Sequence, residues 1–174
     1  MRRVQVAIKM HSINFGESNL KMNLQDDDQL LEAASLLAYT AIEKVNDDLT
    51  KLQQPLQTVY CVYHATGIID HGGFLHFFES DFPCHPPYSC FFNALQKIGC
   101  EEQARALQVA VESFGLPDPE NHISQRLNFM EAHFDEKTQT ITVWDDCIRE
   151  NDEVWTRLAT WIRNQPELIK LIQQ

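Results

Sequence analysis

Residues 69–80 read Ile-Asp-His-Gly-Gly-Phe-Leu-His-Phe-Phe-Glu-Ser, with three phenylalanines directly after a pair of glycines. Such a dense set of aromatic side chains has to leave water on folding, whereas two adjacent glycines permit a tight turn or a close approach of the backbone. We therefore expect this segment to form the centre of the core. The residues of this structural motif are Gly72, Gly73, Phe74, Phe77 and Phe78.

On both sides of this segment, apolar residues recur at spacings of three and four, which is typical of amphipathic helices. Asp26-Asp27-Asp28 can cap the N-terminus of the first helix. The polar run Asn46-Asp47-Asp48 can break this helix before its end. Pro55 suits the first turn of the next helix, although its β-branched residues also fit a strand. The predicted helical segments are 29–52, 55–63, 89–98, 101–114, 121–130, 154–162 and 166–172.

The first 21 residues differ from the rest of the chain. Val4, Val6 and Ile8 alternate with polar neighbours, so they form either a strand-like arm or, if translation begins at Met22, a poorly ordered extension. Residues 138–143 have the other pattern of strand type. The sequence thus predicts an all-α fold: a compact multi-helix single domain over residues 22–174, with an extension over residues 1–21 that includes a short strand-like arm.

The composition indicates one protein domain of the cytoplasm. A chain of 174 residues with 44% hydrophobic content can bury one sizeable core, and it contains no apolar run of membrane-spanning length. The N-terminus lacks the apolar run and cleavage site of a secretory signal. Five cysteines without regular spacing favour reduced thiols over a disulfide framework.

The charge of the chain is its most informative bulk property. Asp and Glu number 25 against 14 Lys and Arg, for a formal net charge of −11, and residues 22–174 carry 24 of these acids against 10 bases. This charge argues against direct nucleic-acid binding, because neutralisation of phosphates requires the opposite sign. A basic protein partner fits better, although composition alone favours the simpler explanation that the negative charge merely confers solubility.

Acidic residues gather in two parts of the chain, which are the candidate partner-binding surfaces. The late cluster lies between residues 145 and 153 and is predicted to lie partly on one helix face, where like charges repel by a few tenths of a kcal/mol per pair. The early cluster is secondary, and Glu32, Glu43, Asp47 and Asp48 add to its field. The candidate binding residues are Asp145, Asp146, Glu150, Asp152 and Glu153, followed by Asp26, Asp27 and Asp28.

A metal-dependent enzyme is the weaker alternative, and we assign no catalytic residue, metal ligand or cofactor. His71 and His76 stand five positions apart, which places them on different faces of an uninterrupted helix. The spacings match no zinc pattern, and the chain has no nucleophile elbow, phosphate loop or dinucleotide fingerprint. The residues of metal-ligand type in this region are His64, Asp70, His71, His76, Glu79, Cys84, His85 and Cys90.

Three segments together resemble a known family. The quoted stretch 69–80 is similar to a motif with a polar pair, then Gly-Gly-Phe, then His-Phe-Phe-x-Ser. Residues 93–104 look like the helix pair that follows this motif in the family. Residues 144–155 look like the family's aspartate-rich late segment. The resemblance is to the bacterial DNA-mimic protein family of neisserial type and covers residues 26–174. Asp70-His71 replaces the two asparagines common in that family, and the basic extension has no counterpart.

This resemblance implies an all-helical fold and a homodimer whose acidic surface imitates the phosphates of duplex DNA. The expected partner is a basic DNA-binding protein, a helix-turn-helix regulator that is thereby kept from its operator. The alternative within the binding class is an immunity or antitoxin-like protein that blocks a basic toxin or nuclease. Both hypotheses describe a protein-binding module that carries out no reaction.

Overall fold

The computed structural model describes residues 23–133, 147–149 and 151–174. Within these ranges the chain is all-α, as predicted, and contains no strand. The predicted N-terminal arm and the strand-like segment 138–143 lie outside the described residues. The elements are α2 (Asp27–Glu43), η1 (Leu49–Lys51), α3 (Leu56–Glu79), α4 (Ser89–Lys97), α5 (Glu101–Glu112), η2 (Pro119–Asn121), α6 (Ile123–His133), α8 (Asp152–Arg163) and α9 (Pro166–Ile172).

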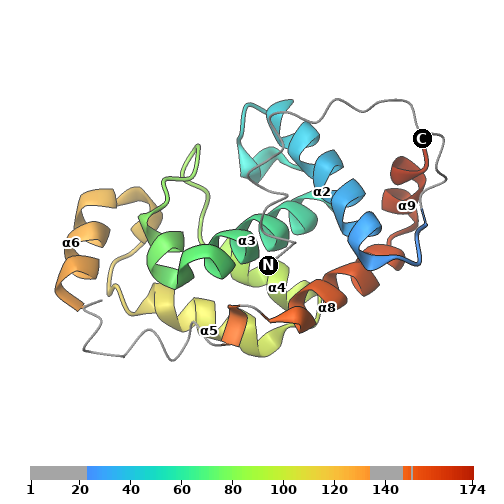
Figure 1. The fold of residues 1–174 in the computed structure, drawn as a ribbon. Helices are drawn as coiled ribbons and strands as arrows, with labels where there is room; N and C mark the ends of the chain where they lie inside the picture. Colours follow the sequence, from blue (N-terminus) through green and yellow to red (C-terminus); the bar gives the residue numbers. More distant parts are fainter. Residues whose placement is uncertain (1–22, 134–146, 150) are drawn as a thin grey trace.

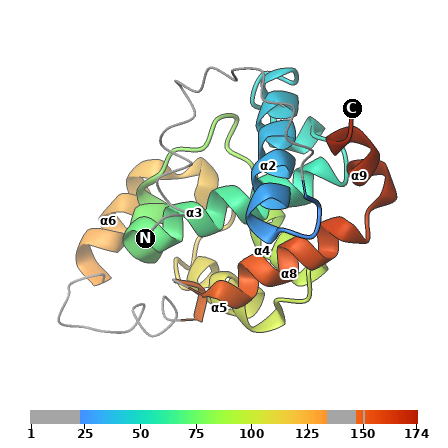
Figure 2. The ribbon, with the colours of Figure 1, turned by 45° about the vertical axis from the view of Figure 1, so that its right-hand side comes forward.

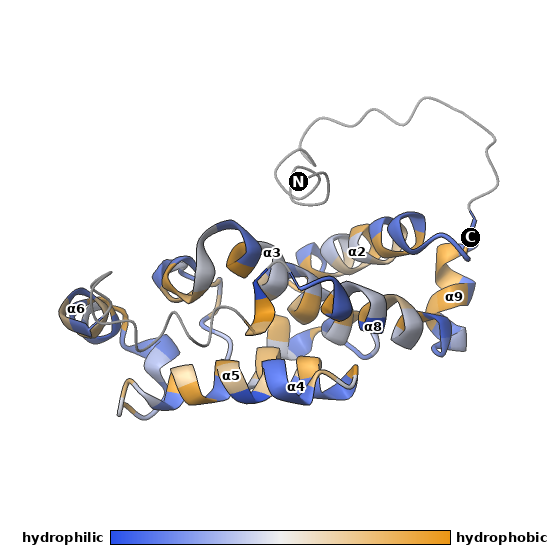
Figure 3. Cartoon of the chain, turned by 60° about the horizontal axis from the view of Figure 1, so that its bottom comes forward, coloured by the Kyte–Doolittle hydropathy of each residue, from blue (hydrophilic) through white to orange (hydrophobic). Residues whose placement is uncertain are grey.

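Helix α3 is the central element, since it contacts α2, α4, α6 and α8. Figure 1 shows it running through the middle of the molecule, with α6 at one end and α2 and α9 at the other. In Figure 3 the helix α2 forms the upper layer, and α4 and α5 form the lower one. None of the helices in the described residues is both long and apolar enough to cross a membrane.

The aromatic residues of the quoted segment lie at the centre of the core. Phe74, Phe77 and Phe78 have no exposed surface. The ring of Phe77 packs against that of Phe91 in α4 with 5.3 Å between the ring centres, and the ring of Phe78 packs against that of Phe114 at 5.0 Å. Burying a Phe side chain contributes about 1.5–3 kcal/mol, so this cluster holds α3 to the lower layer.

The long first helix that periodicity predicts through Leu52 ends earlier, at Glu43. Asn46 and Asp47 both have positive φ values, 55° and 59°, and two left-handed residues in succession cannot continue a right-handed helix. The predicted break near these residues is therefore confirmed. Asp48 then begins η1, because its carboxylate accepts a hydrogen bond from the backbone N–H of Thr50.

The pair Gly72-Gly73 bends α3 without ending it. Gly72 has φ −148° and ψ 18°, and Gly73 has φ 69° and ψ −168°, so two residues inside the helix are not helical. Only glycine adopts the conformation of Gly73 at little cost. The bend divides α3 into a first part that packs under α2 and a second part that carries the phenylalanines into the core.

Helix α6 is fixed to the end of α3 by a buried arginine. Arg126 is 1% exposed. Its Nε donates to the carbonyl of Phe78 at 2.7 Å and its Nη1 to that of Pro119 at 2.8 Å, with longer contacts to the carbonyls of Glu120 and Ser80. A buried guanidinium is thus solvated by carbonyl groups at the C-terminus of α3 and in η2, where free carbonyls and the helix dipole favour a positive charge.

Candidate protein-binding surface

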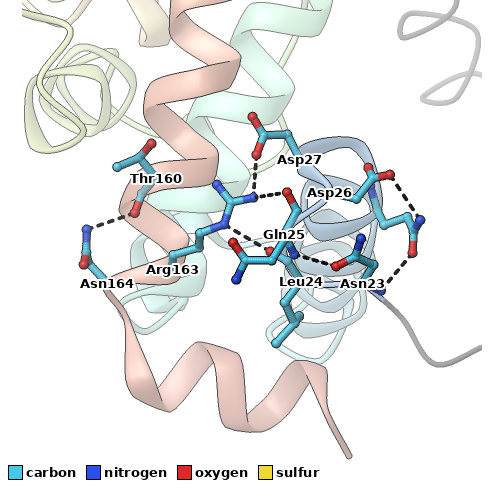
Figure 4. A network of polar contacts seen from close by, with 9 residues as sticks. Asn23, Leu24, Gln25, Asp26, Asp27, Thr160, Arg163 and Asn164 are labelled. Carbon is cyan, nitrogen blue, oxygen red and sulfur yellow. Dashed lines mark hydrogen bonds and ion pairs between the residues drawn. The ribbon is translucent and has the colours of Figure 1, made fainter.

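Two of the three aspartates of the early cluster hold the start of α2 in place. Asp26 is the N-cap: its Oδ1 accepts from the backbone N–H of Gln29 at 3.1 Å. Asp27 accepts from Nη2 of Arg163, which lies 136 positions later at the end of α8. Figure 4 shows the guanidinium of Arg163 between Asp27 and the backbone before it. These two carboxylates therefore stabilise the fold in addition to placing negative charge at the surface.

Arg163 ties the last turn of α8 to the chain segment that enters α2. Besides the ion pair, its Nε donates to the carbonyl of Leu24 and its Nη2 to that of Gln25, both at 3.1 Å. Its side chain is 27% exposed. Hydrogen bonds from a charged donor to otherwise unpaired carbonyls are stronger than neutral ones, so this junction matters more than an exposed ion pair.

We expect Arg163→Ala to lower the free energy of unfolding by about 1–2 kcal/mol, because three acceptors lose their donor at once. Arg157→Ala on the same helix is the matched control, since Arg157 forms a surface ion pair with Glu153 four positions earlier and both side chains are about half exposed. Urea unfolding of the two variants and the parent protein measures the difference. Equal stability of both variants would contradict the structural role of Arg163.

The outward face of α2 carries the rest of the early cluster. Asp28, Glu32 and Glu43 are all exposed. At 100° per residue they fall within about 60° around the helix axis and spread over about 22 Å along it. Burial raises the pKa of Tyr63 in α3, and the negative charges of Glu32 and Asp28 raise it further. The field of this face thus reaches the neighbouring helix.

The late cluster is described only in part. Asp145, Asp146 and Glu150 lie outside the described residues. Asp152 and Glu153 are exposed in the first turn of α8, where carboxylates face the positive end of the helix dipole. Glu153 accepts two hydrogen bonds from Arg157, at 3.2 and 3.0 Å, which offsets part of its charge.

The described residues of the two acidic clusters stand at opposite ends of α8. Asp152 and Glu153 begin this helix of 12 residues, whereas Asp27 is bonded to its last residue, Arg163. A helix of this length measures about 18 Å, and Figure 2 shows α8 passing below the start of α2. The structure therefore places the carboxylates of the two clusters that it describes in two groups about one helix length apart. The group on the face of α2 is the more extended of the two.

The residues of metal-ligand type are spread over several elements. Among the described residues no three His, Cys, Asp or Glu side chains form a group suited to one metal ion. His64 instead shares a hydrogen bond with Tyr39 of α2: its Nδ1 lies 2.9 Å from the hydroxyl of Tyr39. Cys84 lies in the loop before α4, where its Sγ is 3.8 Å from the carbonyl of Asn46.

One cavity opens between the first turns of α3 and the face of α4, with a volume of about 310 Å³. Its walls carry amides, hydroxyls and two thiols together with one charged group, Lys97. Burial raises the pKa of Cys61 and of Cys90, so both thiols stay protonated and unreactive.

His71 and His76 are closer together than the sequence predicts. Their ring centres lie 5.7 Å apart, because α3 is bent between them. The prediction that they occupy different faces was wrong, since it assumed an uninterrupted helix. The arginines at positions 126 and 163 are the important side chains that sequence reasoning missed, and no local pattern marks an arginine whose acceptors are distant in the chain.

Comparison with known proteins identifies the family. The family described as DMP19-like protein matches residues 50–165, which include the described helices from α3 to α8. The searches of curated proteins and of solved structures found no match. The acids of α8 fall inside the matched residues, whereas helix α2 precedes them. The chain belongs to the DMP19-like protein family, which is the family of DNA mimics that its sequence resembles.

Proposed function

We propose that the protein is a DNA mimic that occupies the DNA-binding surface of a basic transcription regulator of helix-turn-helix type in the cytoplasm. Membership of the DMP19-like family carries this proposal. The net charge of −11 and the carboxylates on one face of α2 support it. The homodimer expected from the family resemblance would present two copies of this face.

The face of α2 reproduces only some of the charges of duplex DNA. Three carboxylates over about 22 Å compare with about one phosphate per 1.7 Å of duplex axis. The N-cap Asp26 and the exposed Asp47 after the helix lengthen the acidic face, whereas the charges of Asp27 and Asp48 are offset by ion pairs with Arg163 and Lys51. We infer that the protein matches selected phosphate contacts of its partner and relies on long-range attraction for fast association.

The first test is capture of partners from the native lysate on the immobilised full-length chain, followed by elution with duplex DNA and, separately, with salt. We expect a basic DNA-binding regulator to be released by both, because it cannot hold the mimic and DNA at once. A captured nuclease whose active site is blocked would support the immunity-protein alternative instead. A partner that DNA does not displace would contradict mimicry.

The second test localises the surface. We expect the triple variant Asp28→Asn, Glu32→Gln and Glu43→Gln to bind the regulator about tenfold more weakly, as the loss of about 1.4 kcal/mol of attraction would require. The matched control, Glu101→Gln, Glu102→Gln and Glu112→Gln, removes the same charge from exposed positions of α5 in the opposite layer (Figure 3). Equal loss in both variants would show that total charge, and not α2, determines binding.

A further inference from the structure

The bend in α3 brings two exposed histidines side by side. His71 precedes the glycine pair and His76 follows it, and their rings are tilted by 58° with 5.7 Å between the ring centres. Both side chains are exposed, so the rings can turn about their side-chain bonds. In an uninterrupted helix, residues five apart differ by about 140° around the axis and do not meet.

The glycines are what permit this approach. A Cβ atom at position 72 would lie 2.6 Å from the Cβ of His76, which is closer than two such carbons can come. At position 73 the positive φ of 69° excludes most other residues. The sequence thus has glycine at the two positions that any side chain would disturb, with a histidine before and after them.

The separation of the two rings suits a shared metal ion. A zinc or similar ion about 2.1 Å from one nitrogen of each imidazole lies about 3.2 Å from each ring centre, and a tetrahedral angle between the ligands then separates the ring centres by about 5.3 Å. The observed separation of 5.7 Å is close to this value, and both side chains are exposed, so rotation about their side-chain bonds can turn one nitrogen of each ring toward a shared ion. Imidazole is a good ligand for zinc, copper and nickel.

We propose that His71 and His76 form a two-histidine binding site for a divalent transition-metal ion at the bend of α3. Neutral imidazole nitrogens supply two ligands. Water completes the coordination in the isolated protein, because no third His, Cys, Asp or Glu of the described ranges joins the pair in a metal-binding group. The site is therefore open, and its affinity rests on the simultaneous presence of both histidines.

Isothermal titration calorimetry of the untagged full-length protein with Ni²⁺ tests this site. We expect one Ni²⁺ per chain, and about tenfold weaker binding in His71→Ala and in His76→Ala, since each variant keeps one ligand. The control His122→Ala removes an exposed histidine in another part of the fold and should bind as the parent does. Unchanged binding in the double variant His71→Ala/His76→Ala would overturn the proposal, because the ion would then sit on other donors.

A second pair of variants leaves both histidines in place and changes only their distance. Gly72→Ala places a Cβ 2.6 Å from the Cβ of His76, so the two residues must move apart, whereas a Cβ at Gly67 in the same helix meets nothing within 4 Å. We expect weaker Ni²⁺ binding in the first variant and parental binding in the second. Paramagnetic broadening of NMR signals from the bend locates the ion in the parent protein; broadening centred elsewhere would also overturn the proposal.

Discussion

Replacement of Arg126 by methionine is expected to lower the free energy of unfolding by about 3 kcal/mol, the largest effect of any single change proposed for this protein. The guanidinium donates to carbonyls of Phe78, Pro119, Glu120 and Ser80, and it has almost no contact with solvent. An unsatisfied buried carbonyl costs about 1–3 kcal/mol. Several such groups would lose their donor together.

An opposing effect reduces the expected loss. Burying a guanidinium is costly, and methionine removes that cost while filling similar space. In the other direction, the variant loses a contact between the guanidinium and the ring of Tyr88, whose centre lies 5.8 Å from the guanidinium carbon; such a contact contributes about 0.5–2 kcal/mol. We expect the unpaired carbonyls to dominate, because the methionine sulfur cannot donate a hydrogen bond to any of them.

Urea unfolding of Arg126→Met and of Arg105→Met measures this difference. Arg105 is an exposed residue of α5, and surface substitutions of this kind usually change stability by less than about 0.5 kcal/mol. Hydrogen exchange should additionally show faster exchange in α6, which Arg126 holds against α3. If Arg126→Met were as stable as the parent protein, the carbonyls would have to be satisfied by water or by a rearranged loop.

The helices could be predicted from the sequence because their causes are local. The apolar periodicity of 89–98 and 101–114 matches α4 and α5, and Gly99 between them has the positive φ, 81°, that such a junction requires. Asp26 caps α2 as its position suggests. The largest overrun is at the end of α2, where Asn46 and Asp47 adopt positive φ although neither is glycine. The helix predicted over 55–63 instead continues to Glu79.

The candidate surface was less predictable because its geometry depends on distant parts of the chain. Asp27 reads as a free acidic residue in the sequence, yet its partner is Arg163. His71 and His76 read as separated, yet a bend between them brings their rings together. A sequence shows how many carboxylates or imidazoles are present, whereas their spacing in space follows from tertiary contacts that no short motif records.

Acidification from pH 7 to pH 5 is expected to cost the protein about 2 kcal/mol of stability through His64 alone. Burial lowers the pKa of His64 to about 4. Its ring is stacked on that of Tyr60 with 5.0 Å between the ring centres and lies edge-on to Phe82 at 5.7 Å. Burial also raises the pKa of Tyr39, whose hydroxyl lies 2.9 Å from the Nδ1 of His64 and shares a hydrogen bond with it.

The sign of this effect follows from the difference between the folded and unfolded states. In the unfolded chain the pKa of a histidine is about 6.5, so between pH 6.5 and 4 the unfolded state binds a proton that the folded state does not. Acid therefore favours unfolding. The contribution of His64 to stability is complete above about pH 6.5 and is lost progressively as the pH falls toward the folded-state pKa.

Chemical unfolding of His64→Asn and His122→Asn at the two pH values isolates this contribution. Asparagine can accept the hydrogen bond from Tyr39 but does not titrate, so the loss between pH 7 and pH 5 should shrink by about 2 kcal/mol even if the variant is less stable at both. His122 is exposed, and its variant should lose as much as the parent protein. An unchanged pH dependence in His64→Asn would mean that His64 protonates in the folded state, with the aromatic contacts between α2 and α3 open to water.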